Sequence, residues 1–191
     1  MGFNIVLSSP SGAGKTTITK KISQKYPNIK ISISHTTRKP RSNEIDGVDY
    51  HFVSKEKFEK LIKENNFYEH AKIFDNYYGT SKKSVNKLHD ENYDVVFDID
   101  WQGTKQLSQF KELNLIKIFI LPPDKKELKK RLINRNQDNN QIVEKRLKQY
   151  ENDIQHWFDY DYVVINNDLE SCFSQIEKII KSHKKEKMSF I

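Results

Sequence analysis

The sequence has 191 residues, and 33 lysines and arginines against 26 aspartates and glutamates give a net charge of +7. A mean hydropathy of −0.81 and apolar runs of only a few residues exclude a membrane-spanning helix, which needs about 20 apolar residues. The length fits one domain or one core with an insertion, and the lone Cys172 excludes an internal disulfide and a thiolate metal cluster.

The first predicted elements are a strand, a loop and a helix. Residues 4–8 form a short apolar strand with no secretory signal before it, so we expect a cytoplasmic protein. A glycine-containing loop leads to a helical pattern that Pro27 stops, and residues 29–33 are a second predicted strand.

Residues 34–90 are predicted as a small mixed insertion between strands of the sheet. Its elements are a polar loop over 36–47, a strand over 48–53, a helix over 55–63 with Ser54 as N-cap, and a hairpin over 67–78 that turns at Asp75 and Asn76 and ends at Gly79.

From residue 81 onwards, strands and helices alternate, which is typical of a parallel sheet covered on both faces. The order is a helix over 81–89, a strand over 94–98, a helix over 103–110, a strand over 116–121, helices over 124–134 and 142–157 around a break at 136–141, a strand over 162–165 and a helix over 169–182. The basic stretch 181–187 is interpreted as a frayed helix end.

Only five of the 33 basic residues are arginines, and these are candidate site residues because a planar guanidinium binds phosphate or carboxylate through two parallel hydrogen bonds, which lysine cannot do. They are Arg38, Arg41, Arg131, Arg135 and Arg146. The lysines are spread between acidic residues, which favours a solvated surface over nucleic-acid binding.

The segment from Ser9 to Thr16 has the pattern of a phosphate-binding P-loop and lies between a predicted strand and a predicted helix, as that motif requires. Backbone N–H groups of Gly12, Gly14 and Lys15 would hold the β-phosphate. The Lys15 ammonium would bridge the β- and γ-phosphates, and the Thr16 hydroxyl would bind Mg2+. Ser9 replaces the first glycine of the motif, so its backbone angle is open.

The polar loop of the insertion predicts a second phosphate site. Arg38 and Arg41 lie three positions apart, and two guanidinium groups can hold one phosphate dianion. Glu44 would orient a guanidinium, and Tyr50 would donate its O–H. The alternative is an exposed basic turn.

The P-loop and residues 36–52, which read Thr-Thr-Arg-x-Pro-Arg-x-x-Glu-x-x-Gly-x-x-Tyr-x-Phe, together resemble guanylate kinase, although Asn43 stands where that family usually has glycine. The likeness continues through Glu69, 76–80, 98–103, 121–123, 131–146 and 166–168. It implies an α/β fold with a P-loop NTPase-type parallel sheet core flanked by helices over 1–33 and 91–191, a GMP-binding insertion over 34–90, and a helical lid over about 125–146. The implied enzyme is a nucleoside monophosphate kinase that converts ATP and GMP to ADP and GDP with Mg2+.

The resemblance assigns GMP binding to Ser34, Arg38, Arg41, Glu44, Tyr50, Glu69, Tyr78, Gly79, Thr80 and Asp100. Guanine presents two adjacent donors, N1–H and the 2-amino group, and one carboxylate can accept from both. Glu69 fits that task, and the Thr80 hydroxyl can meet O6. Adenine lacks this donor pair and would leave the buried carboxylate unpaired, which favours GMP over AMP.

The resemblance assigns ATP binding to Ser9, Pro10, Ser11, Gly12, Ala13, Gly14, Lys15, Thr16, Thr17, Arg131, Arg135 and Asn167, and catalysis to Lys15, Arg38, Arg135, Arg146 and Asp98. Strand alternation puts Asp98 and Asp100 on one face if the strand continues that far. The resemblance implies that Asp98 lies towards the metal, with Thr16, and that Asp100 lies towards the acceptor. The alternatives are a helix-capping Asp100 and an ion pair of Arg131 with Glu127 or Glu144.

We therefore expect ATP and GMP or dGMP as small-molecule partners, no nucleic-acid or membrane partner, and a monomer or homodimer. Two other functions stay open, namely a non-catalytic guanylate-kinase-like module that binds protein ligands and a P-loop kinase for another acceptor such as a ribose phosphate. Intact Lys15 and Thr16 argue against the first, and Glu69 with Thr80 argues against the second.

Overall fold

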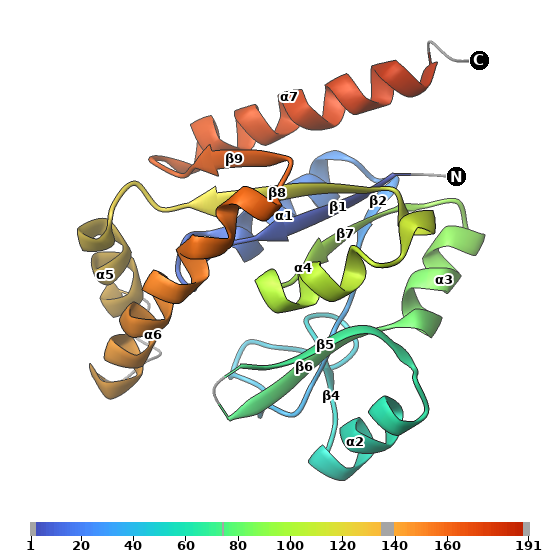
Figure 1. The fold of residues 1–191 in the computed structure, drawn as a ribbon, viewed down its shortest axis with the longest axis horizontal. Coiled ribbons are helices and arrows are strands. Elements are labelled where there is room, and N and C mark those ends of the chain that lie inside the picture. The colour runs from blue at the N-terminus through green and yellow to red at the C-terminus, as the bar shows by residue number, and fades with distance from the viewer. Residues whose placement is uncertain (1–2, 74, 135–139, 189–191) are drawn as a thin grey trace. The chain divides into compact units, whose positions relative to one another are not determined.

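The computed structural model describes residues 3–73, 75–134 and 140–188, and the chain forms two compact units. The first unit comprises Met1–Val6 and Pro27–Ile116, and the second comprises Leu7–Tyr26 and Lys117–Ile191. Figure 1 labels the helices and strands. Each unit contains a pair of parallel strands and several helices, so the predicted α/β class is confirmed.

The larger sheet has the strand order β2-β7-β1-β8-β9. Its strands are β1 (Asn4–Ser8), β2 (Ile29–Ile31), β7 (Asp94–Asp98), β8 (Leu115–Leu121) and β9 (Tyr162–Ile165). In the first unit β2 pairs with β7 in parallel, and in the second β8 pairs with β9 in parallel. The strands predicted over 4–8, 94–98 and 162–165 are confirmed, whereas β2 ends two residues early and β8 begins one residue early.

The smaller sheet lies in the first unit and has the order β4-β3-β6-β5. Its strands are β3 (His35–Thr36), β4 (His51–Phe52), β5 (Phe67–Ile73) and β6 (Asn76–Ser81). β5 and β6 form the predicted antiparallel hairpin, which extends to Ser81 rather than ending at Gly79.

The strand predicted over 48–53 is wrong in its first half. Val48 N–H and Asp49 N–H both donate to the Ile45 carbonyl, at 3.2 and 3.0 Å, so these residues form a turn. The side chains of Ile45 and Val48 are 62% and 63% exposed, and no sheet face buries them. Only His51–Phe52 joins the sheet, against β3, whose Thr36 was predicted as loop.

Serine caps precede two helices of the first unit, of which the cap at Ser54 was predicted and the cap at Ser81 was not. Ser54 Oγ accepts from Lys57 N–H before α2 (Lys55–Lys63), and Ser81 Oγ accepts from Ser84 N–H before α3 (Lys82–Asp90). The next helix, α4 (Trp101–Leu107), begins and ends earlier than predicted and is followed by a 3-10 turn at Lys111–Leu113. The core under these helices consists of Val6, Val85, Val95, Phe97, Ile99, Leu107 and Leu113.

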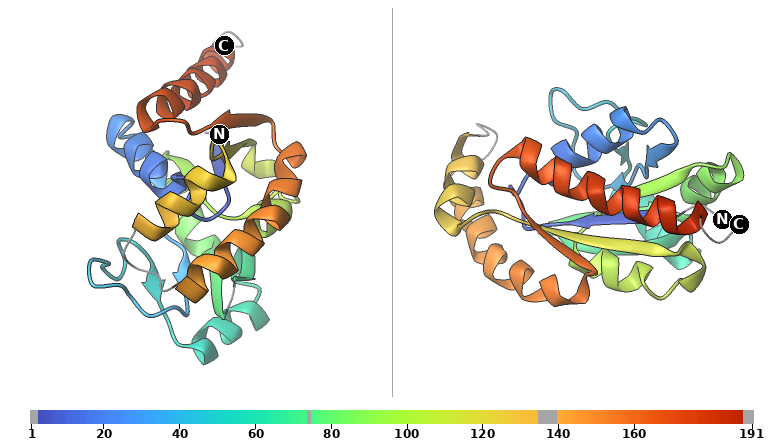
Figure 2. Two further views of the ribbon diagram at one scale, coloured as in Figure 1. Left: turned by 90° about the vertical axis from the view of Figure 1, so that its left-hand side faces the viewer. Right: turned by 90° about the horizontal axis from the view of Figure 1, so that it is seen from above.

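The helices of the second unit are α1 (Lys15–Lys25), α5 (Lys125–Asn134), α6 (Asn140–Asp153) and α7 (Leu169–Met188). α1 and α7 lie side by side in both views of Figure 2, joined by the Lys21–Glu170 ion pair and by the Tyr26 O–H, which donates to Glu177 at 2.8 Å. The last helix continues past its predicted end at 182 to Met188, and Lys181 lies 3.4 Å from Glu177, one turn earlier. α6 is shorter than predicted and gives way to a 3-10 helix at Ile154–Asp159.

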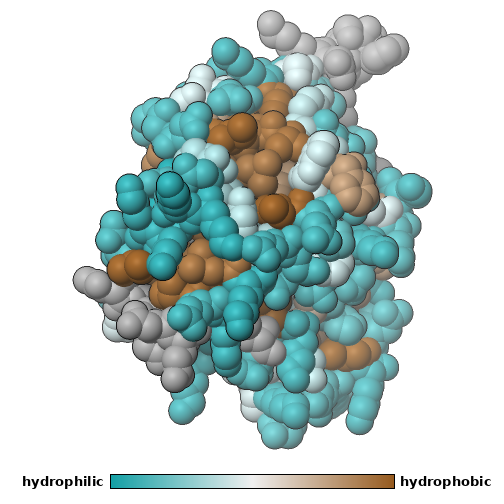
Figure 3. Space-filling view, turned by 60° about the vertical axis from the view of Figure 1, so that its left-hand side comes forward, coloured by the Kyte–Doolittle hydropathy of each residue, from teal (hydrophilic) through white to brown (hydrophobic). Residues whose placement is uncertain are grey.

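Hydrophilic residues cover most of the face drawn in Figure 3, with a few apolar patches between them. In the described part of the chain no helix has the length and apolar character needed to cross a membrane.

His35 in β3 is packed among aromatic rings. Its ring centroid lies 4.7 Å from that of His51 and 5.6 Å from that of Phe67. Burial, followed by the nearby charges of His51 and Lys57, lowers the pKa of His35 from 6.5 to about 4, while Asp46 acts in the opposite direction. The folded unit therefore holds His35 neutral.

Acid should destabilise the first unit through His35. The unfolded chain takes up a proton at this histidine near pH 6.5, and the folded chain does so only near pH 4. The contribution of neutral His35 to the free energy of unfolding is therefore fully present above pH 6.5 and is lost as the pH falls towards 4. The free energy of unfolding, measured by denaturant titration across this range, should fall more steeply for the wild type than for His35→Gln. Equal slopes would contradict this assignment.

Candidate functional site

Two glycines shape the loop between β1 and α1 in the second unit. Gly12 has φ +94°, and Gly14, the N-cap of α1, has φ +97°. An L side chain rarely adopts this left-handed conformation. Ser9 is not among the non-glycine residues of the described ranges that have positive φ, so the serine in place of the first glycine is compatible with the loop.

Neighbouring side chains pack closely on this loop. A Cβ on Gly12 would lie 2.8 Å from Leu132 Cδ2, on α5. A Cβ on Gly14 would collide with the side-chain nitrogen of Asn166, which follows β9. Asn166 Nδ2 also donates to the Ala13 carbonyl at 2.7 Å. Glycine is therefore favoured at 12 and 14 by the backbone angle, and an added Cβ would also displace the Leu132 or Asn166 side chain.

α1 starts at Lys15, directly after this loop, and Thr16 and Thr17 are exposed in its first turn. The first backbone N–H groups of a helix have no partner within it and form a binding site for anions. With the Lys15 ammonium and the Thr16 hydroxyl beside them, these groups can bind a chain of phosphates.

Two of the predicted arginines lie against the same loop and the segment after β9. Arg146 Nη1 donates to Ser11 Oγ at 2.9 Å. Arg131 donates through Nη2 to the carbonyls of Asn166 and Asn167, at 3.0 and 3.3 Å.

The alternative weighed for Arg131 is also present, because its Nε donates to Glu127 at 3.0 Å. Arg135 lies outside the described residues.

A cluster of charged groups in the first unit brings together Arg38, Arg41 and Glu44. Arg38 Nη2 donates to both carboxylate oxygens of Glu44, at 2.8 and 2.9 Å. Arg41 donates its backbone N–H to Glu44 Oε2 at 2.8 Å, and its Nη1 lies 3.6 Å from Oε1. Although burial acts to raise it, these donors hold the pKa of Glu44 below its usual value. Glu44 thus fixes both arginines, and Asn43 beside it needs no positive φ.

Two phenols complete this cluster. The Arg38 guanidinium lies 5.4 Å from the centre of the Tyr50 ring, and the Tyr50 and Tyr78 centroids are 6.0 Å apart, edge to face. Burial, then the charge of Asp98, raises the pKa of Tyr50. Tyr50 therefore remains an O–H donor at neutral pH, beside the arginines, where a phosphate can bind.

Glu69 and Thr80 face each other across the β5–β6 hairpin. Their side chains are 3% and 0% exposed. Ser34 Oγ lies 3.4 Å from Thr80 Oγ1, within hydrogen-bond distance. A buried carboxylate beside two hydroxyls can recognise a ligand that offers both donors and acceptors.

Asp98 ends β7, and Asp100 begins α4 as its N-cap. Both are partly exposed and flank the buried Ile99, as the alternation predicts. Asp100 accepts hydrogen bonds from Gly103 N–H at 2.9 Å and from the Gln102 side chain at 3.1 Å, so the capping alternative is observed.

Sequence reasoning did not single out Gln106. The structure places its side chain on the backbone of His70, next to Glu69. No local pattern could have revealed this contact, because it joins α4 to the edge of a sheet 36 residues earlier.

Comparison with known proteins gives concordant results. The family model described as guanylate kinase matches residues 2–183. Guanylate kinase of Rickettsia bellii is 47% identical over 97% of this chain and 97% of its own length, and that of Paramagnetospirillum magneticum is 44% identical over 96% and 86%. The crystal structure of guanylate kinase from Anaplasma phagocytophilum is 35% identical, with a TM-score of 0.79 over 95% of this chain and 86% of that one.

Gly14→Ala should disturb the loop before α1 in two ways, through a strained backbone angle and through a collision of the new methyl group with Asn166. Gly47, with φ +77° and no atom within 4 Å of an added Cβ, provides the matched control, because Gly47→Ala adds strain without a collision. We expect the free energy of unfolding of both variants to fall by about 1–2 kcal/mol, because alanine is strained in the left-handed conformation. Only Gly14→Ala should also lose affinity for a nucleoside triphosphate. Thermal unfolding and calorimetric titration measure the two effects, and equal triphosphate affinities in the two variants would contradict the assignment.

Proposed function

Because the chain belongs to the guanylate kinase family and is thus a nucleoside monophosphate kinase, we propose that it transfers the γ-phosphoryl group of ATP to GMP, giving ADP and GDP. The observation that supports GMP as the acceptor is the buried Glu69 directly opposite Thr80, in the same unit as the paired Arg38 and Glu44. One unit thus contains both a base-recognition pair and a phosphate clamp. The proposed role is in purine nucleotide metabolism, as recycling of GMP.

In this proposal the acceptor phosphate binds to the side chains of Arg38, Arg41, Tyr50 and Tyr78, with Glu44 holding the two arginines. The Glu69 carboxylate accepts from guanine N1–H and the 2-amino group, and Thr80 donates to O6. Adenine would leave the buried carboxylate without donors, at a cost of roughly 1–3 kcal/mol or more. Ser34, Gly79 and Asp100 complete the GMP site.

ATP binds to the loop residues 9–14 and the first turn of α1, together with Arg131, Arg135 and Asn167. Lys15, Arg38, Arg135 and Arg146 stabilise the charge that spreads over the transferred phosphoryl group. The GMP phosphate is already anionic at neutral pH, so its oxygen attacks in line without a general base. The protein contributes position and charge neutralisation.

Mg2+ accompanies ATP in this proposal. This ion is commonly held by one or two protein oxygens and by substrate phosphates. The Thr16 hydroxyl and the Asp98 carboxylate are oxygen donors of the required kind, and the described residues contain no group of three or more His, Cys, Asp or Glu that could hold a metal. When bound, Mg2+ neutralises phosphate charge.

We further propose the division of the chain into a core over 1–33 and 91–191, a GMP-binding part over 34–90 and a lid over 125–146. The proposed setting is the cytoplasm, with a monomer or a homodimer, dGMP as a second acceptor, and neither nucleic acid nor membrane as a partner.

The proposal is tested by ADP formation from ATP and Mg2+ with GMP, dGMP, AMP, UMP, CMP and ribose phosphates offered in parallel. We expect turnover with GMP and dGMP alone, and none with Lys15→Ala, which keeps the fold but loses the ammonium at the phosphates. Turnover confined to a ribose phosphate would overturn the acceptor assignment. A folded wild-type protein that binds GMP without turnover would instead indicate the non-catalytic module.

Glu69→Gln should raise the KM for GMP and spare that for ATP. The amide presents an N–H where guanine presents its own donors, and losing hydrogen bonds to a charged group corresponds to roughly a ten- to hundredfold effect. Glu59→Gln, at a position of α2 whose side chain is 45% exposed, removes a carboxylate from the same unit and should leave both KM values unchanged. Steady-state kinetics decide the point, and an equal loss for both nucleotides would refute the role of Glu69.

A further inference from the structure

We propose that Gln106 and Gly103 of α4 are positioning residues, which hold the Glu69 carboxylate in place for the guanine base. The proposal rests on the guanine-binding role of Glu69 given above. Neither residue is assigned a contact with substrate. Gln106 acts through the strand that carries Glu69, and Gly103 acts through the space it leaves beside the carboxylate.

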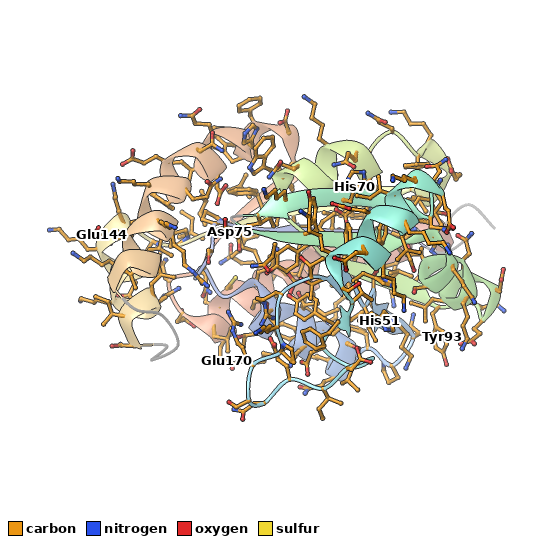
Figure 4. The ribbon with its side chains drawn as sticks, turned by 90° about the horizontal axis from the view of Figure 1, so that it is seen from below. His51, His70, Asp75, Tyr93, Glu144 and Glu170 are labelled. Atoms are coloured by element: carbon orange, nitrogen blue, oxygen red, sulfur yellow. The ribbon has the colours of Figure 1, made fainter. Side chains whose placement is uncertain are left out.

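Gln106 takes the place of a neighbouring strand at the edge of the small sheet. β5 is the last strand in the order β4-β3-β6-β5. On α4, Gln106 Oε1 accepts from the His70 N–H at 3.1 Å, and Nε2 donates to the His70 carbonyl at 2.7 Å. This pair of bonds to one residue is the pattern that an antiparallel strand would make. His70 is labelled on β5 in Figure 4.

The bonds act directly on Glu69. The His70 N–H belongs to the peptide group that joins Glu69 to His70, so Gln106 fixes the plane attached to the Glu69 Cα. Immediately before it, the pairing with β6 shifts register between Phe67 and Glu69. A register shift of this kind interrupts the regular ladder of hydrogen bonds and leaves β5 less constrained by β6 at this point. Gln106 restores the constraint on the other edge.

Gly103 provides the space in which the carboxylate lies. A Cβ at this position would be 2.5 Å from Glu69 Oε2 and 3.0 Å from Cδ. Gly103 and Gln106 are three residues apart, so they lie on the same face of α4. The same helix begins at Asp100, whose side chain accepts from the Gly103 N–H. One helix face therefore holds the strand by its backbone and leaves room for its carboxylate.

Burial makes this placement consequential. Glu69 is only 3% exposed, so bulk water cannot replace the hydrogen bonds that a displaced carboxylate would fail to make with the guanine base. Displacement should weaken binding of the base and leave the distant steps of the reaction intact. The expected signature is a raised KM for GMP with kcat and the KM for ATP unchanged.

The first test compares Gln106→Leu, Gln106→Glu and the control Gln109→Leu. Gln109 is exposed, follows α4 and lines the same cavity as Gln106, but its side chain is not on the His70 backbone. We expect Gln106→Leu to raise the KM for GMP about tenfold, which corresponds to about 1.4 kcal/mol. Gln106→Glu keeps an acceptor for the His70 N–H but places a second acceptor against the His70 carbonyl, so it should raise the KM for GMP at least as much as Gln106→Leu. Gln109→Leu should match the wild type.

Gly103→Ala separates positioning from folding. Alanine favours a helix more than glycine does, so the helix itself should not lose stability. The added methyl group nevertheless meets the carboxylate, and the KM for GMP should rise while thermal unfolding shows an intact fold. A GMP site that tolerates this methyl group would overturn the part of the proposal that concerns Gly103.

Glu69→Gln, measured in parallel, distinguishes failure of this proposal from failure of the proposed function. If Glu69→Gln raises the KM for GMP and the α4 variants do not, the positioning role is wrong and the role of Glu69 stands. If Glu69→Gln changes nothing, both are wrong. If Gln106→Leu raises the KM values for GMP and ATP equally, the effect is general destabilisation, and the positioning role is overturned.

Discussion

A buried carboxylate is the constraint on which the first unit depends. Glu69 is nearly inaccessible to solvent, and burying a polar group in such a place costs free energy unless hydrogen-bond donors meet it. The hairpin puts Thr80 opposite it, and α4 lies along the edge of β5 with a glycine beside the carboxylate and a glutamine on the neighbouring peptide. The small sheet and α4 thus meet around one buried acidic side chain.

The second unit uses the same physical means at a different site. Its loop before α1 is held by close packing, with Leu132 against Gly12 and the Asn166 side chain against Gly14. Asn166 also binds the Ala13 carbonyl, and Arg131 binds the carbonyls of 166 and 167. The end of β9 therefore fixes the loop that is proposed to bind phosphate, and in both units glycine marks where another group must approach the backbone.

Much of this organisation could be predicted from the sequence because its signals are local. Apolar runs gave β1, β7 and β9, and a serine cap gave the start of α2, since a capping hydroxyl acts within three residues of its own position. Arginines among many lysines indicated Arg38, Arg131 and Arg146, which the structure brings to polar partners. The roles of these residues in binding remain predictions.

The rest could not be predicted because it depends on partners far away in the chain. Val48 stands in an alternating pattern typical of a strand, yet no sheet face covers its side chain. The segment therefore forms the turn that is hydrogen-bonded to the Ile45 carbonyl instead of a strand. In the sequence, nothing distinguishes Gln106 from other polar residues of a short helix. Its hydrogen bond to β5 is visible only in the fold, where β5 is the edge strand of the small sheet. A motif can therefore identify the groups that touch a ligand, whereas the groups that hold them in place become visible only when distant segments meet.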